Sequence, residues 1–244
     1  MRDGASFASM AATAQAQPPL AGRRVAVAGA GGGLGPSVVE ALKRAGAWVA
    51  ASDRDEDRLV PLRGAADHLT AVDLTTAEGA AGWAAELERV DALLHLVGGW
   101  RGGPHVEEMD LADLALLERV LFHSVVHVTR AFAPLLKAAG ERGRFAMVSS
   151  SVAARPTAGN AAYAAAKAAA EAWTLALAAE LAGNGATANI VVVNAIVTPR
   201  MRAEQPDEPF ATFTDAAEIA DALVFLCSDS ARRMNGQRLS LHGP

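Results

Sequence analysis

Two side chains of this sequence have the types and the spacing needed for proton transfer. Tyr163 is the one tyrosine of the chain, and Lys167 follows four residues later in an alanine-rich run. Residues four apart lie on the same face of a helix, so the ammonium group is expected to lie near the phenol, favour its ionised form and lower its pKa. A phenol with a lowered pKa can act as an acid or a base near neutral pH.

A glycine-rich segment near the N-terminus has the composition of a phosphate-binding turn. The apolar run 25–28 leads into closely spaced glycines, and a helix-like stretch begins at Pro36, which suits a first helical turn. Glycines let the backbone approach a pyrophosphate, and the free N–H groups at a helix start bind anions. The spacing is Gly29-x-x-x-Gly33-x-Gly35 rather than G-x-G-x-x-G, and an ordinary loop is the alternative. The expected contacts with a dinucleotide are Gly29, Gly31, Gly32, Gly33, Leu34 and Gly35.

An acidic residue at the end of the second predicted strand indicates which dinucleotide binds. Asp53 follows the glycine turn by about twenty residues, where a carboxylate can accept hydrogen bonds from both adenosine ribose hydroxyls and repel a 2'-phosphate. Arg54 could favour the phosphorylated cofactor, whereas Gly32 stands where a basic residue would have bound that phosphate. We therefore expect NAD, with NADP possible. The alternative is that Asp53 only begins a solvated acidic run over 53–57.

Together, these residues resemble the short-chain dehydrogenase/reductase family, and the resemblance extends from about residue 23 to residue 243. It implies that Tyr163 delivers or removes a proton, that Lys167 holds the nicotinamide ribose, and that a serine hydrogen-bonds the substrate carbonyl. Spacing from the tyrosine favours Ser150 for that serine, whereas the Val-Ala pair that follows favours Ser151. The alternative for both serines is an ordinary turn at a strand end.

The same resemblance implies further cofactor contacts. Asp73 and the Leu74 backbone would face the adenine, unless Asp73 is only a helix N-cap, and Thr198 would hydrogen-bond the nicotinamide carboxamide. After the fourth strand most members have Asn-Asn-Ala-Gly, whereas this chain runs from His95 to a Gly-Gly-Trp segment that is locally similar to the dihydropteridine reductase branch. The contacts expected in this turn are Val97, Gly98 and Gly99.

Two other positions depart from the family pattern. Leu121 occupies the place of an asparagine that usually holds a water of the proton relay, and leucine cannot hold that water. His123 and Ser124 lie nearby but are rotated around the helix, so whether either substitutes is left open. His123 and His127 share a helix face, but no third ligand is evident, so no metal site is expected.

The substrate end of the site is the least defined by the sequence. The segment 199–214, which should cover the substrate, is short and rich in charge and proline, and this suggests an open or partly disordered site. Arginines could approach the mouth, so an anionic or polar carbonyl substrate is one hypothesis, and solvated arginines are the alternative. The arginines concerned are Arg101, Arg155, Arg200 and Arg202. The candidate substrate contacts are Trp100, Arg101, Arg155 and Asn160.

Composition and patterning predict a single α/β domain. The chain has 244 residues, 51% hydrophobic and 20% charged, and its formal net charge of −5 gives no reason to expect nucleic-acid binding. Its single cysteine, Cys227, fits a reducing cytoplasm. We expect a loose tail over 1–20, one domain over 21–244, and no stretch that spans a membrane.

Short β-rich runs alternate with helical ones, which is typical of a doubly wound parallel sheet, the Rossmann fold. The predicted strands are 25–28, 48–52, 68–72, 92–97, 144–149, 188–193 and 238–241. The predicted helices are 36–45, 76–89, 111–139, 161–182 and 215–228. We expect an NAD(H)-dependent oxidoreductase that acts on a carbonyl or secondary alcohol; the alternative is a dinucleotide-binding sensor or scaffold with weak catalysis. By resemblance, helices 111–139 and 161–182 pack subunits into a tetramer or dimer.

Overall fold

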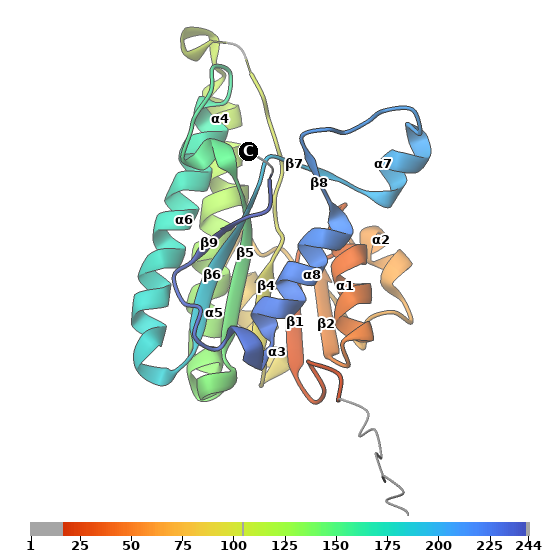
Figure 1. Ribbon diagram of the computed structural model, residues 1–244. Helices are drawn as coiled ribbons and strands as arrows, with labels where there is room; N and C mark the ends of the chain where they lie inside the picture. The colour runs from red at the N-terminus through yellow and green to blue at the C-terminus, as the bar shows by residue number, and fades with distance from the viewer. Residues whose placement is uncertain (1–16, 104, 243–244) are drawn as a thin grey trace, which may run out of the picture.

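Seven parallel strands form the central sheet of the computed structural model, which describes residues 17–103 and 105–242. The strand order is β3-β2-β1-β4-β5-β6-β9 (Figure 1). The strands are β1 (Arg24–Ala28), β2 (Trp48–Asp53), β3 (His68–Ala71), β4 (Ala92–His95), β5 (Arg144–Ser150), β6 (Thr187–Val193) and β9 (Arg238–Ser240). The order runs outward from β1 in both directions, so the doubly wound parallel sheet predicted from the sequence is confirmed.

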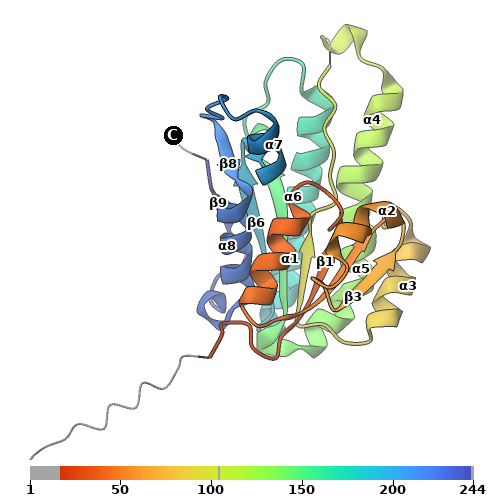
Figure 2. The same ribbon diagram turned by 90° about the vertical axis from the view of Figure 1, so that its right-hand side faces the viewer.

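Helices cover both faces of this sheet (Figures 1 and 2). On one face, α1 (Gly35–Arg44) packs against α8 (Ala216–Cys227). On the other face, α5 (Ser124–Ala138) lies between α3 (Ala77–Leu87) and α6 (Ala161–Leu181). Right-handed βαβ crossovers produce this alternation and leave the carboxyl ends of the strands open at one edge.

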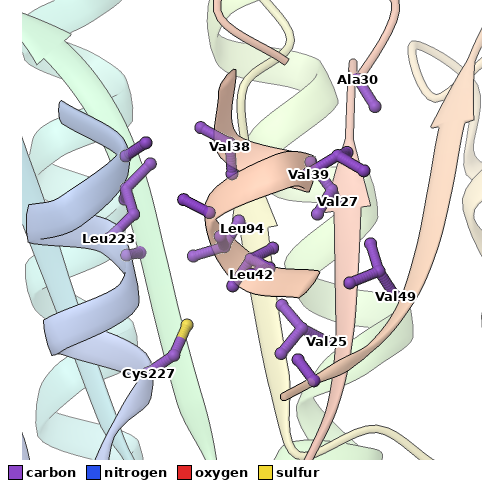
Figure 3. Packing of buried hydrophobic residues seen from close by; sticks show 14 of the residues in the cluster. Val25, Val27, Ala30, Val38, Val39, Leu42, Val49, Leu94, Leu223 and Cys227 are labelled. Atoms are coloured by element: carbon purple, nitrogen blue, oxygen red, sulfur yellow. The ribbon is translucent and has the colours of Figure 1, made fainter. Parts of the chain in front are cut away.

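The two faces bury separate apolar clusters because the strands are apolar on both sides. On the α1 and α8 face, Val38 and Leu42 of α1 and Leu223 of α8 pack over Val25 and Val27 of β1 (Figure 3). Cys227 is buried in the same cluster, and burial raises the pKa of its thiol to about 12. Cys227 is therefore a buried and chemically inert thiol.

The long helix predicted over 111–139 is not continuous. It consists of α4 (Leu111–Leu117), a π-helical segment (Glu118–His123) and α5. The Ser124 hydroxyl donates to the Val120 carbonyl at 2.6 Å within this irregular part. A π segment inside a helix is a local widening of the turn and is frequent at functional sites.

Four elements in the structure were not predicted. They are α2 (Glu56–Leu59), α7 (Pro199–Glu204), and the parallel pair β7 (Ala195–Val197) and β8 (Phe213–Asp215). The last three form a small unit above the carboxyl edge of the sheet (Figure 1). The segment 199–214, expected to leave the site open or partly disordered, is thus folded as a helix and a strand. Single 3₁₀ turns complete the chain at Val60–Leu62, Val106–Glu108, Gly140–Arg142, Ser151–Ala153, Ala182–Asn184 and Asp229–Ala231.

The start of the chain divides into two parts. Residues 1–16 of the expected tail lie outside the described residues, whereas Leu20 is fully buried in the core. Across residues 17–103 and 105–242, none of the helices combines the length and the apolar character that a bilayer crossing requires.

Candidate active site

A cavity of about 700 Å³ opens at the carboxyl ends of β1, β4, β5 and β6. It brings the predicted glycine turn and the predicted catalytic side chains into one space, although they are far apart in the sequence. Its volume is in the range of cofactor and substrate sites. The predicted site residues that line it are Gly29, Gly32, Gly33, Leu34, Gly35, Val97, Gly98, Gly99, Trp100, Ser150, Asn160, Tyr163, Lys167 and Thr198.

A second cavity, of about 170 Å³, adjoins the first and shares part of the glycine turn with it. The predicted residues Asp53, Arg54, Asp73 and Leu74 line this smaller cavity. Arg58 of α2 lines it too, and sequence reasoning missed this residue because the short helix α2 was not predicted. The two cavities together form an elongated site with one end near Asp53 and the other near Tyr163.

The glycine turn is held by backbone packing. Gly29 has a φ of +80°, and a Cβ there would lie 2.7 Å from the Val97 backbone nitrogen. A Cβ at Gly35 would lie 1.9 Å from the Ala30 carbonyl oxygen. No side chain fits at either position, so the backbone of the turn is free to face a ligand.

The two acids of the smaller cavity are fixed by hydrogen bonds from nearby backbone and side-chain groups. Asp53 accepts a hydrogen bond from the Gly31 N–H at 3.1 Å, which ties the carboxylate to the glycine turn, although Gly31 itself lines neither cavity. Asp73 accepts from the N–H and the hydroxyl of Thr75. Burial raises the pKa of Asp73, but the bonds from Thr75 and the charge of Arg54 outweigh burial, so the pKa lies below its usual value. The N-cap of α3 is Thr76, so Asp73 is not the capping residue.

Ser150 and Ser151 have different surroundings. Ser150 is buried, lines the large cavity and interacts through its side chain with Tyr163. Ser151 does not line that cavity, and its hydroxyl donates to the Asn194 Oδ1 at 2.5 Å. The structure therefore brings Ser150, and not Ser151, together with the tyrosine.

Burial dominates the electrostatics of the tyrosine–lysine pair. It raises the pKa of Tyr163, and the Ser150 hydroxyl only partly offsets this effect. Lys167 is buried and donates to the Val148 carbonyl at 2.9 Å, and burial lowers its pKa to about 8, against the opposing charge of Glu171. The expectation that Lys167 directly lowers the tyrosine pKa is thus not met, because the ammonium is directed to a backbone carbonyl.

Trp100 and Asn160 meet at the open end of the large cavity. The Trp100 Nε1–H donates to the Asn160 Oδ1 at 3.3 Å, and the Asn160 Nδ2 donates to Thr157 at 2.9 Å. Trp100 is nevertheless 64% exposed. Asn160 therefore orients the indole, which forms one wall of the mouth.

The arginines expected near this mouth are engaged elsewhere or solvated. Arg200 pairs with Glu204, Arg202 with Asp215, and Arg101 lies 3.8 Å from Asp113. Arg155 is exposed, and none of the four lines the large cavity. The arrangement therefore fits the alternative interpretation, that these arginines are solvated, better than the hypothesis that they bind an anionic substrate.

Three residues that were not predicted complete the substrate end. Asn194 follows the last residue of β6, and Val152 and Phe213 add apolar surface. Asn194 could have been found from its place at a strand end, whereas Phe213 comes from the unpredicted strand β8. The rings of His123 and His127 lie 6.3 Å apart, and the part of the chain that the structure describes holds no cluster of three metal-ligating side chains.

Comparison with known proteins places this geometry in a family. A family profile described as enoyl-(acyl carrier protein) reductase matches residues 29–243. The chain belongs to the short-chain dehydrogenase/reductase family. As a short-chain dehydrogenase/reductase it is an oxidoreductase, and the resemblance drawn from Tyr163, Lys167 and the glycine turn is confirmed at the level of the family.

Relatives of this short-chain dehydrogenase/reductase match 92% of its length. The 2,3-dihydroxy-2,3-dihydro-p-cumate dehydrogenase of Pseudomonas putida is 31% identical, over 92% of this chain and 95% of that protein. A putative gluconate 5-dehydrogenase structure from Beutenbergia cavernae with bound NADP is 30% identical, with a TM-score of 0.79, over 92% and 96% of the two chains. A 3-ketoacyl-(acyl-carrier-protein) reductase from Brucella melitensis complexed with NADH is 25% identical, with a TM-score of 0.81, over 92% and 98%. A nicotinamide dinucleotide is thus the cofactor type of its neighbours.

Proposed function

We propose that this protein moves a hydride between the nicotinamide C4 of NAD(H) and the carbon of a carbonyl or secondary alcohol. The observation that carries the proposal is the convergence of Ser150, Tyr163 and Lys167 in the same cavity as the glycine turn. The shape supports it, because the cavity extends from the turn to the tyrosine and then to an open mouth beside Trp100. The residues present fit a dinucleotide, since the backbone at Gly29 and Gly35 leaves no room for a Cβ.

Each side chain has a separate task in this proposal. The bound cofactor supplies or accepts the hydride. Ser150 donates a hydrogen bond to the substrate oxygen, and Tyr163 gives that oxygen a proton during reduction or takes one during oxidation. A tyrosine pKa raised by burial keeps the phenol protonated at neutral pH, which suits the reductive direction. Lys167, fixed by the Val148 carbonyl, holds the nicotinamide ribose beside the phenol.

The preference for NAD over NADP is proposed from the smaller cavity. Asp53 is anchored to the turn, and its carboxylate would repel a 2'-phosphate. Arg54 and Arg58 line the same cavity and offer positive charge, so NADP is the second candidate, in keeping with the NADP-bound neighbour. We further propose a homotetramer or homodimer, a cytoplasmic location and a small uncharged substrate.

A dinucleotide-binding sensor with weak catalysis is the second candidate function. It is favoured by Leu121, which is buried in an apolar cluster with Leu117, Ala162 and Ala166 and so offers no polar group to a relay. The placement of Ser150 beside Tyr163 in the cavity argues against the sensor, because a sensor does not need these groups.

Variants of Tyr163 and the two serines test the enzyme against the sensor. We expect Tyr163→Phe to lower kcat about a hundredfold or more, because general acid–base catalysis contributes this much, while NADH still binds in a fluorescence titration. Ser150→Ala is expected to lower kcat more than Ser151→Ala. If Tyr163→Phe oxidised NADH at the wild-type rate in the presence of a carbonyl substrate, the proposed role of Tyr163 would be ruled out. If the wild-type protein bound NADH but did not oxidise it with any carbonyl substrate, the sensor would be favoured.

A further inference from the structure

Arg144 is a buried arginine at the edge of the sheet opposite to the candidate active site. It is the first residue of β5, so it lies at the amino end of a strand whose carboxyl end carries Ser150. Only 1% of its surface is exposed. A buried guanidinium is costly unless its N–H groups are hydrogen-bonded and its charge is compensated. Arg144 therefore needs partners that do both.

One nitrogen of this guanidinium has a partner and two do not. Nη1 donates to the Gly143 carbonyl at 2.8 Å. Nε and Nη2 are buried, and neither has a hydrogen-bond partner among residues 17–103 and 105–242. The N–H of Nε and one N–H of Nη2 point the same way along one edge of the planar group, so the two nitrogens can donate to a single acceptor. This edge of Arg144 is therefore a buried pair of donors.

A buried hydroxyl group is unpaired at the same place. Thr187 begins β6 and is the register partner of Arg144, so both side chains lie on the same face of the sheet as Ala146, which packs in the cluster under α1 and α8. The Thr187 N–H donates to the Gly143 carbonyl at 3.0 Å, the same oxygen that Nη1 of Arg144 binds. Its Oγ1 has no partner in the part of the chain that the structure describes. The hydroxyl and the guanidinium thus belong to one buried region.

Carboxylates do not balance the positive charge of this region. A second buried arginine, Arg23, donates from Nη1 to the Arg142 carbonyl at 2.8 Å, so the two guanidinium groups bind the carbonyls of consecutive residues. Arg23 pairs with Asp229, whose side chain is 78% exposed. Asp91, a buried acid at this edge, is engaged by Arg142 at 3.1 Å. Within the described ranges, no carboxylate forms an ion pair with Arg144.

The pKa of Arg144 agrees with this imbalance of charge. Burial, and then the charge of Arg23, lower the pKa of the guanidinium from its usual value, and the opposing influence of Asp229, Cys227 and Glu141 is smaller. An arginine nevertheless keeps its proton in a protein at neutral pH, because its ordinary pKa is so high. The buried charge therefore persists and must be compensated by a group outside the described residues.

We propose that Nε and Nη2 of Arg144, together with the Thr187 hydroxyl, bind a small monovalent anion such as chloride. All three groups can donate, and an anion accepts each of these bonds and compensates the guanidinium charge, whereas a water molecule supplies an acceptor but no charge. Both side chains are buried, so the site admits an ion of about one atom in size and not a larger carboxylate or phosphate. The anion stabilises the amino edge of the sheet and takes no part in turnover.

The position of the anion is tested by crystallography with bromide, which replaces chloride and is located by its anomalous X-ray scattering. In crystals of the full chain grown in sodium bromide, we expect an anomalous peak within hydrogen-bond distance of Arg144 Nε and Nη2 and of Thr187 Oγ1. A water molecule at this position would overturn the proposal. So would bromide peaks at the protein surface alone, which would mean an adventitious ion only.

The Tm in solution tests the same site when sodium chloride replaces sodium gluconate at constant ionic strength, because gluconate is too large for a closed site. We expect the wild-type Tm to rise with chloride and level off, as for one saturable site. Thr187→Val keeps the side-chain shape without the hydroxyl and should need about tenfold more chloride for the same rise. Arg144→Met should show no chloride dependence.

Arg130→Met, which removes an exposed arginine of α5, is the matched control and should respond to chloride like the wild type. If Arg144→Met does not fold, the comparison of Thr187→Val with this control decides. A wild-type Tm that is equal in the two salts would overturn the proposal. A chloride response that is the same in Thr187→Val, Arg130→Met and the wild type would overturn it as well, since the ion would then act elsewhere.

Discussion

The two ends of the elongated site are built in different ways. At the cofactor end, the backbone is packed so tightly that Gly29 and Gly35 admit no Cβ. At the substrate end, Gly99 has no atom within 4 Å of the place of a Cβ, and Trp100 is largely exposed. The cofactor end is therefore fixed by close backbone contacts, and the substrate end by a few side chains on loops. Relatives named for different substrates are consistent with this division.

The largest expected effect comes from adding a methyl group to the glycine turn at the closely packed cofactor end. In Gly35→Ala the methyl group meets the Ala30 carbonyl, a backbone atom that cannot move aside, so we expect a loss of about 3–5 kcal/mol in the free energy of unfolding. NADH binding is expected to weaken with it. Gly99→Ala, in the open end, is the matched control, with a change within about 0.5 kcal/mol. Urea denaturation of both variants checks this, and equal losses would contradict the proposed difference between the two ends.

A smaller effect is expected from the charge at the far end of the cofactor site. Asp53→Asn keeps the shape of the side chain and removes the charge that would repel a 2'-phosphate. We expect the ratio of the Kd for NADPH to the Kd for NADH to fall about tenfold, measured by fluorescence titration. Asp57→Asn, in the same acidic run but outside the smaller cavity, is expected to leave the ratio unchanged. A ratio that is the same in both variants would show that Asp53 does not select the cofactor.

The smallest effect on stability is expected at the open end. Trp100→Ala removes an indole that is 64% exposed and held by Asn160, so the free energy of unfolding should change by less than about 0.5 kcal/mol. The kcat/KM for the best carbonyl substrate should fall by about tenfold or less, with NADH affinity retained. A loss of NADH affinity as large as the loss of kcat/KM would show that the two ends are not independent.

The same difference explains what could be predicted from the sequence. The strands of the sheet, the glycine turn and the position of Asp53 follow from local patterns, because apolar runs, glycines and strand ends are features of short segments. Phe213 joins the site through the pairing of β7 with β8, which depends on long-range contacts and leaves no local signal. The choice between Ser150 and Ser151 was open because spacing does not show which way a side chain points.

The pKa values of the site residues were the second feature that could not be predicted from the sequence. The four-residue spacing of Tyr163 and Lys167 predicted a lowered tyrosine pKa, but burial, which the sequence does not give residue by residue, raises it. The π segment around Leu121 could not be predicted from the sequence either, because its residue types are those of an ordinary helix.

Hydride transfer at the junction of the two ends is tested most directly with NADH that carries deuterium at C4. The purified protein would be given this cofactor, with each C4 face labelled in turn, and a panel of ketones, diketones and quinonoid pterins. We predict that one label appears on the former carbonyl carbon of a product, detected by mass spectrometry, and that Tyr163→Phe gives none. Tight NADH binding with no label in any product would contradict the enzyme and favour the sensor.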